Sequence, residues 1–184
     1  MKNLNKKYQI LCAFVILLVV ALACGGGDTG DDTSSQDDLT EVSQWGDSAT
    51  ASSEYSNPSW AALQAAGPPD TEGCGDIETS WASASSTGED WLEVEYALSV
   101  IPVQIDIYET YHPGSITEVE VRDEDGDYHT VWTGTPSEEQ DCPRIFSIDV
   151  DDVDVAIDAV RIHLDQSIIG SWNEIDAVQL VGLR

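Results

Sequence analysis

The chain has 184 residues and is strongly acidic, with 35 Asp and Glu residues against 7 Lys and Arg and a formal net charge of −28. All three lysines lie within the first seven residues, so the rest of the chain carries only four arginines. Binding to nucleic acid and docking on an anionic lipid surface both need a cationic surface, and this composition excludes both. Cations and neutral ligands stay open as partners. The length is enough for one domain of about 140 residues with its own core.

The first 23 residues have the pattern of a secretory signal peptide. Lysines precede an apolar run, 10–24, that would be about 22 Å long as a helix, shorter than the ~30 Å hydrocarbon core of a bilayer. The run ends in Ala21-Leu22-Ala23-Cys24, which resembles a bacterial lipobox, where the cysteine is lipidated and the chain is cut just before it. The sequence therefore predicts a signal peptide over 1–23 and a lipid on Cys24. Ordinary secretion after cleavage at the same bond and an uncleaved anchor stay open.

Residues 24–44 are rich in Gly, Ser, Thr and acids and have almost no apolar side chains. Such a segment buries too little surface to offset its ordering entropy, so the sequence predicts a flexible acidic linker after the lipidated cysteine. The domain is then expected over 45–184. We expect the mature protein to be a monomer at the bacterial cell envelope, outside the cytoplasm, with the lipid anchor as its only contact with the membrane.

Two cysteines, Cys74 and Cys142, remain once Cys12 leaves with the signal peptide and Cys24 takes the lipid. Outside the cytoplasm two leftover thiols in one domain most often form a disulfide. Closing a loop of this size would stabilise the fold by about 4 kcal/mol in the chain-entropy model. Two buried free thiols are the alternative. Neither cysteine has a CxxC or CxxH neighbour, which argues against a metal site.

From Trp45 onward, apolar residues recur with a period of two, as in half-buried β-strands. The alternating runs span 91–96, 103–108, 118–122, 146–150 and 160–164. An Asp-Gly pair between Val121 and Val131 predicts a hairpin, and a change of phase between Ala177 and Val178 predicts a bulge in the last strand. One short helix is expected over 59–66. The pattern as a whole predicts an all-β fold, an antiparallel β-sandwich.

Several short motifs resemble the discoidin, or coagulation factor 5/8 type C, group of galactose-binding-like jelly rolls. These motifs are Ala49–Ser53, Trp60–Ala62, Gly67–Thr71, Trp81–Ser83, Trp91–Val94, Ile105–Tyr111 with Pro113-Gly114, and Trp172–Val178. The last two are closer to the divergent branch found in bacterial surface proteins and beside the protease module of pappalysins. The resemblance covers about Ala49 to Gly182 and implies a jelly-roll sandwich. It implies less about the ligand, because such sandwiches have many unrelated binding roles.

The resemblance also implies where a structural calcium ion would lie. In related sandwiches the ion sits between the loop after the first strand and a Glu that opens the last strand, and these positions correspond to Asp70, Thr71 and Glu174. Ala66-Gly67 stands where an Asp-Gly often supplies a ligand, so a metal-free loop held by a Cys74 bridge is the alternative. No other cofactor is expected. The acidic stretch 123–127 is interpreted as a solvated hairpin tip, because an EF-hand loop would need Gly where Tyr128 stands.

Four residues in loops between strands are the candidate ligand contacts, and they are Tyr111, His112, Trp172 and Asn173. Sugar-binding sandwiches stack aromatic faces on pyranose rings, and loops are where such scaffolds bind. Local packing of the loops is the alternative role for these residues. We expect Trp60, Trp81 and Trp91 in the core.

Catalysis has little support in the sequence. There is no G-x-S-x-G or HExxH motif, and the three histidines are scattered, with His129 and His163 expected to face outward from strands. The sequence therefore predicts a non-catalytic, lipid-anchored envelope protein whose discoidin-like module binds a glycan or another surface ligand. A protein partner, or a role as an accessory module of an extracellular complex, is the alternative. The acidity fits either solubility at high salt or a cation-binding surface.

Overall fold

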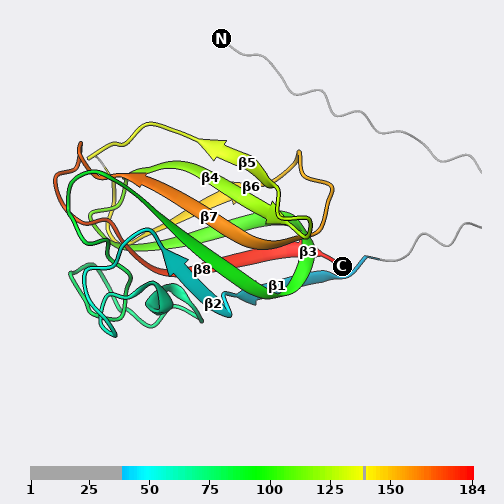
Figure 1. The fold of residues 1–184 in the computed structure, drawn as a ribbon, viewed down its shortest axis with the longest axis horizontal. Coiled ribbons are helices and arrows are strands. Elements are labelled where there is room, and N and C mark those ends of the chain that lie inside the picture. The colour runs from blue at the N-terminus through cyan, green and yellow to red at the C-terminus, as the bar shows by residue number, and fades with distance from the viewer. Residues whose placement is uncertain (1–38, 139) are drawn as a thin grey trace, which may run out of the picture. The chain divides into compact units, whose positions relative to one another are not determined.

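The computed structural model describes residues 39–138 and 140–184. The predicted signal peptide, the lipidation site Cys24 and most of the predicted linker lie outside the described residues. The described part forms eight strands and one short 3₁₀ helix (Figure 1). The elements are β1 (Glu41–Trp45), β2 (Ser48–Ala51), η1 (Ala62–Ala65), β3 (Glu89–Tyr111), β4 (Ile116–Asp123), β5 (Tyr128–Thr133), β6 (Arg144–Asp149), β7 (Ile157–Asp165) and β8 (Glu174–Leu183). No helix among these residues is long and apolar enough to cross a membrane.

The strands form two antiparallel layers, which confirms the predicted β-sandwich. One layer has the order β1-β8-β3-β6, and the other has the order β2-β3-β7-β4-β5. Strand β3 belongs to both layers, because residues 89–95 pair with β2 and β7 whereas residues 101–111 pair with β8. The sequence predicted two separate strands here, and the structure joins them into one bent strand.

The core lies between the two layers and contains the apolar residues of each alternating run. Leu92 and Val94 come from the first half of β3, and Ile105 and Ile107 come from the second half; all four are fully buried. Trp81 is also fully buried, as predicted. The prediction is wrong for Trp60 and Trp91, which are half-buried because neither lies between the layers.

The predicted local features are present, with shifted bounds. Asp123–Asp127 forms the turn of the β4–β5 hairpin, in which Gly126 has a φ of +88° that favours glycine. His129 and His163 lie half-buried on strands β5 and β7 and contact Asp123 and Glu120 respectively. The expected helix over 59–66 is a 3₁₀ helix of four residues, Ala62–Ala65.

The predicted linker ends too late, because its last residues form strand β1. Glu41–Trp45 pairs with β8, and Val42 packs against the core. Gln44 has a further role at the bend of β3. Its side-chain amide donates to the Leu98 carbonyl (2.7 Å) and accepts from the Leu98 N–H (3.2 Å), so it replaces a strand partner where the register between β3 and β7 shifts. The domain therefore begins before Trp45.

The long connections lie at one end of the sandwich and the described chain ends lie at the other (Figure 1). Tyr111 pairs with Glu174 at the loop end, whereas Ile101 pairs with Leu183 at the far end. Thr40 bonds with Arg184 at this far end through both backbone groups. We call the end with the connections 52–88, 112–115, 134–143 and 166–173 the loop end.

We expect a chain that starts at Trp45 to be less stable than one that starts at Asp37, because it lacks β1 and the Gln44 bridge. In the longer chain, Gln44→Ala should cost about 1 kcal/mol, or roughly 4 °C in Tm, as expected for lost hydrogen bonds at a bend. Thermal unfolding followed by circular dichroism measures both effects. Equal Tm values for the two chain lengths would contradict the corrected boundary.

Candidate functional site

The segment from Gly67 to Trp81 crosses the ends of β3 and β8 and forms much of the loop end. Two bulges hold it there. Between Tyr108 and Glu109 the β8 register skips Asp176, and between Glu109 and Tyr111 the β3 register skips Thr110. β8 therefore has a bulge, but it lies at Asp176 and not between Ala177 and Val178, where the sequence predicted it.

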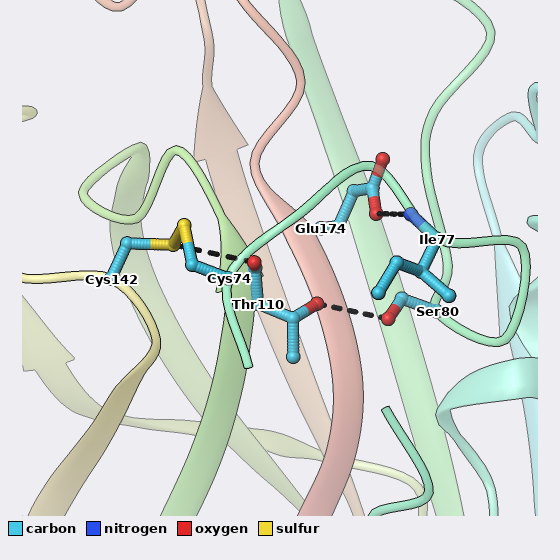
Figure 2. Close-up of a disulfide and its surroundings, with 6 residues drawn as sticks. All are labelled: Cys74, Ile77, Ser80, Thr110, Cys142 and Glu174. Carbon is cyan, nitrogen blue, oxygen red and sulfur yellow. Dashed lines mark hydrogen bonds between the residues drawn. A yellow bond between two sulfur atoms is a disulfide. The ribbon is translucent and has the colours of Figure 1, made fainter. Parts of the chain in front are cut away.

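Thr110 and Asp176, the two bulge residues, form hydrogen bonds with the segment Gly67–Trp81 instead of pairing with the neighbouring strand. The Thr110 carbonyl accepts from the Gly75 N–H (2.9 Å), and its hydroxyl pairs with Ser80 (2.9 Å; Figure 2). The Asp176 carboxylate accepts from the Thr71 N–H (3.3 Å). Bulges re-aim side chains next to functional sites, and here they anchor a loop across the sheet edge.

A disulfide between Cys74 and Cys142 ties the same segment to the loop before β6, which confirms the predicted pairing. Sγ of Cys142 lies 3.3 Å from the Thr110 carbonyl oxygen, so the bridge sits directly on the bulge (Figure 2). The bridge closes a separation of 68 residues and joins two of the four long connections of the loop end.

The three residues expected to hold calcium have different partners. Asp70 and Thr71 lie beside Asp176, to which both donate backbone N–H groups. Glu174 instead accepts from the Ile77 N–H (3.2 Å) and lies beside Asp76. In the part of the chain that the structure describes, no three His, Cys, Asp or Glu side chains are placed to hold a metal. The described side chains therefore do not fit a carboxylate cage for calcium, which needs six to eight oxygen ligands.

Burial perturbs the carboxyl groups at the start of β8. It raises the pKa of Glu174 to about 8, and neighbouring Asp76 adds to this rise, while the Ile77 N–H opposes it. Burial also raises the pKa of Asp176, against the N–H groups of Thr71 and Asp70. Two carboxyls at one sheet edge thus hold their protons more tightly than exposed acids do.

Tyr111 and His112 line a cavity of about 530 Å³ beside the disulfide. The two rings meet edge to face, with centroids 4.3 Å apart. His112 has a φ of +39°, a left-handed conformation that is uncommon outside glycine and often marks functional sites. The other lining residues are Cys74, Pro113, Glu138, Gln140, Cys142 and Ile169. The cavity combines aromatic faces with amide and carboxylate groups, a mixture that can stack on a ring and bond its hydroxyls.

Trp172 lies in a different cluster from Tyr111 and His112. Its ring packs edge to face on Tyr55 (5.4 Å), and Tyr55 packs in the same way on Trp60 (5.4 Å). The Trp172 indole N–H donates to the Ser83 carbonyl (3.0 Å). These three rings line a small cleft together with Asp76, Ala82 and Glu174. We call these three rings, with Asp76 and Glu174, the aromatic cleft.

Asn173 lies beneath both places and is only 1% exposed. Its side-chain oxygen accepts from the Ser115 N–H (3.0 Å), and its own N–H donates to the Gln166 side chain (2.9 Å). These contacts join two connections of the loop end, 112–115 and 166–173. The four expected ligand residues therefore do not form one site. Tyr111 and His112 line the cavity, Trp172 lines the aromatic cleft, and Asn173 is buried and supports the loops.

Comparison with known proteins identifies the family. The family described as "Pappalysin-1, SD scarf domain, C-terminal" matches residues 34–184, most of the chain. The chain belongs to this family. One curated relative, the bovine (Bos taurus) F-box/LRR-repeat protein 4, is 23% identical over 116 residues. That match covers 55% of this chain but only 18% of the relative, so this scarf domain spans about a fifth of it.

Solved structures establish the fold of the scarf domain. A variant of chitosan-binding module 1 from a Paenibacillus sp. IK-5 chitosanase/glucanase is 21% identical, with 73% of this chain and 92% of that chain covered and a TM-score of 0.53. The family 32 CBM of C. perfringens NanJ, solved with galactose, is 19% identical (76% and 99% covered, TM-score 0.54). An F5/8 type C domain from Bacteroides fragilis is 16% identical (79% and 97% covered, TM-score 0.55). The predicted resemblance to discoidin-like and pappalysin domains is confirmed.

The sequence missed five of the residues that line the cavity and the aromatic cleft. Glu138, Gln140 and Ile169 in the scarf domain's cavity lie in loops without any periodic pattern. Tyr55 and Asp76 in the aromatic cleft belong to the long connection between β2 and β3, where only the motifs around them carried a signal. No spacing rule could place these residues, because the bulges and the disulfide fix the connections in space.

In calcium-free buffer, we expect the Glu174→Gln variant to have a higher Tm than the wild-type chain when both are measured at about pH 8 or above. Near pH 5 the two Tm values should be close. Glu174 has a pKa of about 8 in the folded state against an ordinary value of 4.5. Between pH 4.5 and about 8, the folded state therefore binds more protons than the unfolded state. The free energy of unfolding of the wild-type chain falls as the pH rises through this range. Glutamine cannot ionise and keeps an oxygen for the Ile77 N–H. A Tm difference between the two chains that does not change with pH would contradict this assignment.

The same pair of chains tests the calcium that the resemblance implies. Because the described side chains form no carboxylate cage, we expect equal wild-type Tm values in calcium and in EDTA. A rise in calcium that Glu174→Gln abolishes would instead make Glu174 a calcium ligand and overturn this expectation.

Proposed function

We propose that the scarf domain is a non-catalytic, glycan-binding module that a lipidated N-terminus displays on the outside of the cell envelope. The single observation that carries this proposal is the cavity beside the disulfide. It offers the rings of Tyr111 and His112, the Gln140 amide and the Glu138 carboxylate on one open surface. Aromatic faces and planar polar groups are the usual partners of a sugar ring and its hydroxyls.

Related structures support the glycan as ligand class. The proteins with this fold include a chitosan-binding module and a CBM in complex with galactose. Both of these structures are binding modules of larger proteins, and the scarf domain has the same fold. A binding role without catalysis of its own is the simplest function that this fold and this cavity support.

The position of the chain ends supports display at the envelope. Thr40 lies at the end of the sandwich opposite the cavity, because β1 runs beside β8 toward the loop end. A tether that enters at Thr40 leaves the loop end facing outward. The lipobox-like Ala21–Cys24 and the acidic segment after it supply the anchor and the spacer in this proposal.

A protein partner is the second candidate, and one surface favours it. A cavity of about 410 Å³ lies next to the first one and is lined by Pro69, Tyr108, Ile145 and others. Ile145 is 56% exposed, and Tyr108 packs on Trp45 beside it. Exposed apolar groups of this kind are typical of protein interfaces, so an accessory role in an extracellular complex would use this face.

A glycan array with residues 37–184, disulfide intact, tests the leading proposal. We expect saturable binding to at least one glycan class, and Tyr111→Ala should weaken it about three- to tenfold, since one aromatic contact contributes about 0.5–1.5 kcal/mol. Tyr108→Ala is the matched control, because it removes the same ring from the neighbouring face. A folded domain that binds no glycan, or equal losses in both variants, would favour the protein-partner function instead.

A further inference from the structure

The aromatic cleft has the shape and chemistry of a small cation site. Tyr55 lies between Trp60 and Trp172, and both contacts are edge to face at 5.4 Å. Tyr55 is 52% exposed and forms the rim, whereas Glu174 is buried at the base. Trp60 has a φ of +55°, and its backbone bonds to Glu78 and Ala82 hold this strained conformation. The chain thus keeps an aromatic ring in the cleft against its backbone preference.

The size of the cleft limits what can enter it. Its volume is about 30 Å³, which accommodates one or two water-sized groups but not a sugar ring. An ammonium group is about as large as a water molecule, and the ring that carries it would stay outside against the exposed face of Tyr55. A carboxylate or sulfate group would meet the Asp76 carboxylate and the Glu174 carboxyl group there.

The lining of the cleft matches the donors of an ammonium group. Asp76 and Glu174 offer carboxyl oxygens, and Glu174 uses one of its oxygens to accept from the Ile77 N–H. The ring faces of tryptophan and tyrosine attract cations, most strongly where water is excluded. A primary ammonium has three N–H donors, which the Asp76 carboxylate, an oxygen of the Glu174 carboxyl group and one ring face can satisfy.

The rest of the described chain disfavours an anionic glycan. Its permanently cationic side chains are four arginines, and three of them bind carboxylates: Arg122, Arg144 and Arg161. The fourth, Arg184, follows β8 at the far end of the sandwich. The loop end therefore has no uncommitted arginine within the described residues to pair with a uronic acid or a sulfate, and a chain with a net charge of −28 repels such polymers.

We propose that the aromatic cleft binds the ammonium group of an amino sugar, so that the scarf domain selects cationic, deacetylated glycans over neutral and anionic ones. This inference rests on the proposed glycan-binding function and adds to it the ligand class and a second contact point. The sugar ring packs on Tyr55, and its ammonium group enters the cleft beside this ring to reach Asp76 and Glu174.

Glucosamine oligomers and their N-acetylated counterparts test the proposal, because the two differ only in the charge of the amine. Calorimetric titration uses the full chain in detergent at mildly acidic pH, where the amine is protonated and Glu174, with its pKa of about 8, is neutral, so that the Asp76 carboxylate supplies the charge of the cleft. We expect the deacetylated oligomer to bind at least about tenfold more tightly than the acetylated one, the scale of one hydrogen bond between charged groups. Equal or tighter binding of the acetylated oligomer overturns this inference but leaves the proposed glycan-binding function intact.

Two variants locate the contact. Asp76→Asn and Tyr55→Ala change exposed side chains, so the fold should survive, and each should weaken the deacetylated oligomer about three- to tenfold or more while leaving the acetylated one unchanged. Asp125→Asn is the matched control, because it removes the same charge from the exposed hairpin tip at the far end. Equal losses in Asp76→Asn and Asp125→Asn would mean unspecific attraction to an acidic surface and overturn the proposal. Binding of neither oligomer or any other glycan would reject the proposed function as well.

Discussion

The buried carboxylate of Glu109 is the interaction on which the loop end depends. Glu109 is fully buried near the end of β3, where Arg144 contacts it at 2.9 Å and the Gly114 N–H donates to it at 3.1 Å. Burial raises the pKa of Glu109, and Arg144, Gly114 and Asn173 oppose that rise. An unpaired charge at this depth would cost several kcal/mol, so the pair holds β3, β6 and two connections in one arrangement. Tyr111 ends β3 and His112 follows it, and both depend on that arrangement for their position.

The scarf domain uses three of its four arginines, all partly buried, in ion pairs with its own carboxylates. Arg122 and Arg161 both bind Glu93 on the outer face of the layer that contains β7, and Arg161 also lies over the ring of Tyr128. Glu93 is nearly buried, so these pairs neutralise a charge that the sheet could not otherwise hold. Internal use of the cations leaves an acidic exterior. The acidic surface therefore follows in part from the ion pairs, because the arginines in them are not free to balance the exposed acids.

Much of the fold could be predicted from the sequence, because alternation reports which face of a strand is buried. Leu92 and Val94 were placed correctly by this rule. The disulfide was predicted from the two leftover cysteines and the hairpin at Asp123–Asp127 from its Asp-Gly pair, and both are present. The rule could not show that two alternating runs form one bent strand, because that depends on the Gln44 bridge from a distant, polar segment. The site was predicted only in part for the same reason. Trp172 meets Tyr55 through register and bulges, which no local pattern records.

Charge and shape have different roles in the binding that we propose. The net charge of −28 acts over about 8 Å at physiological ionic strength and draws any cationic polymer toward the domain without distinguishing one from another. The aromatic cleft acts only at contact, because its rings admit a group of one size and its carboxylates need a donor there. Salt therefore weakens the first contribution much more than the second, since salt screens separated surface charges more than groups in direct contact within a partly buried cleft. A glycan held mainly by the cleft would keep its preference for the free amine at high salt, whereas one held by surface charge alone would lose it.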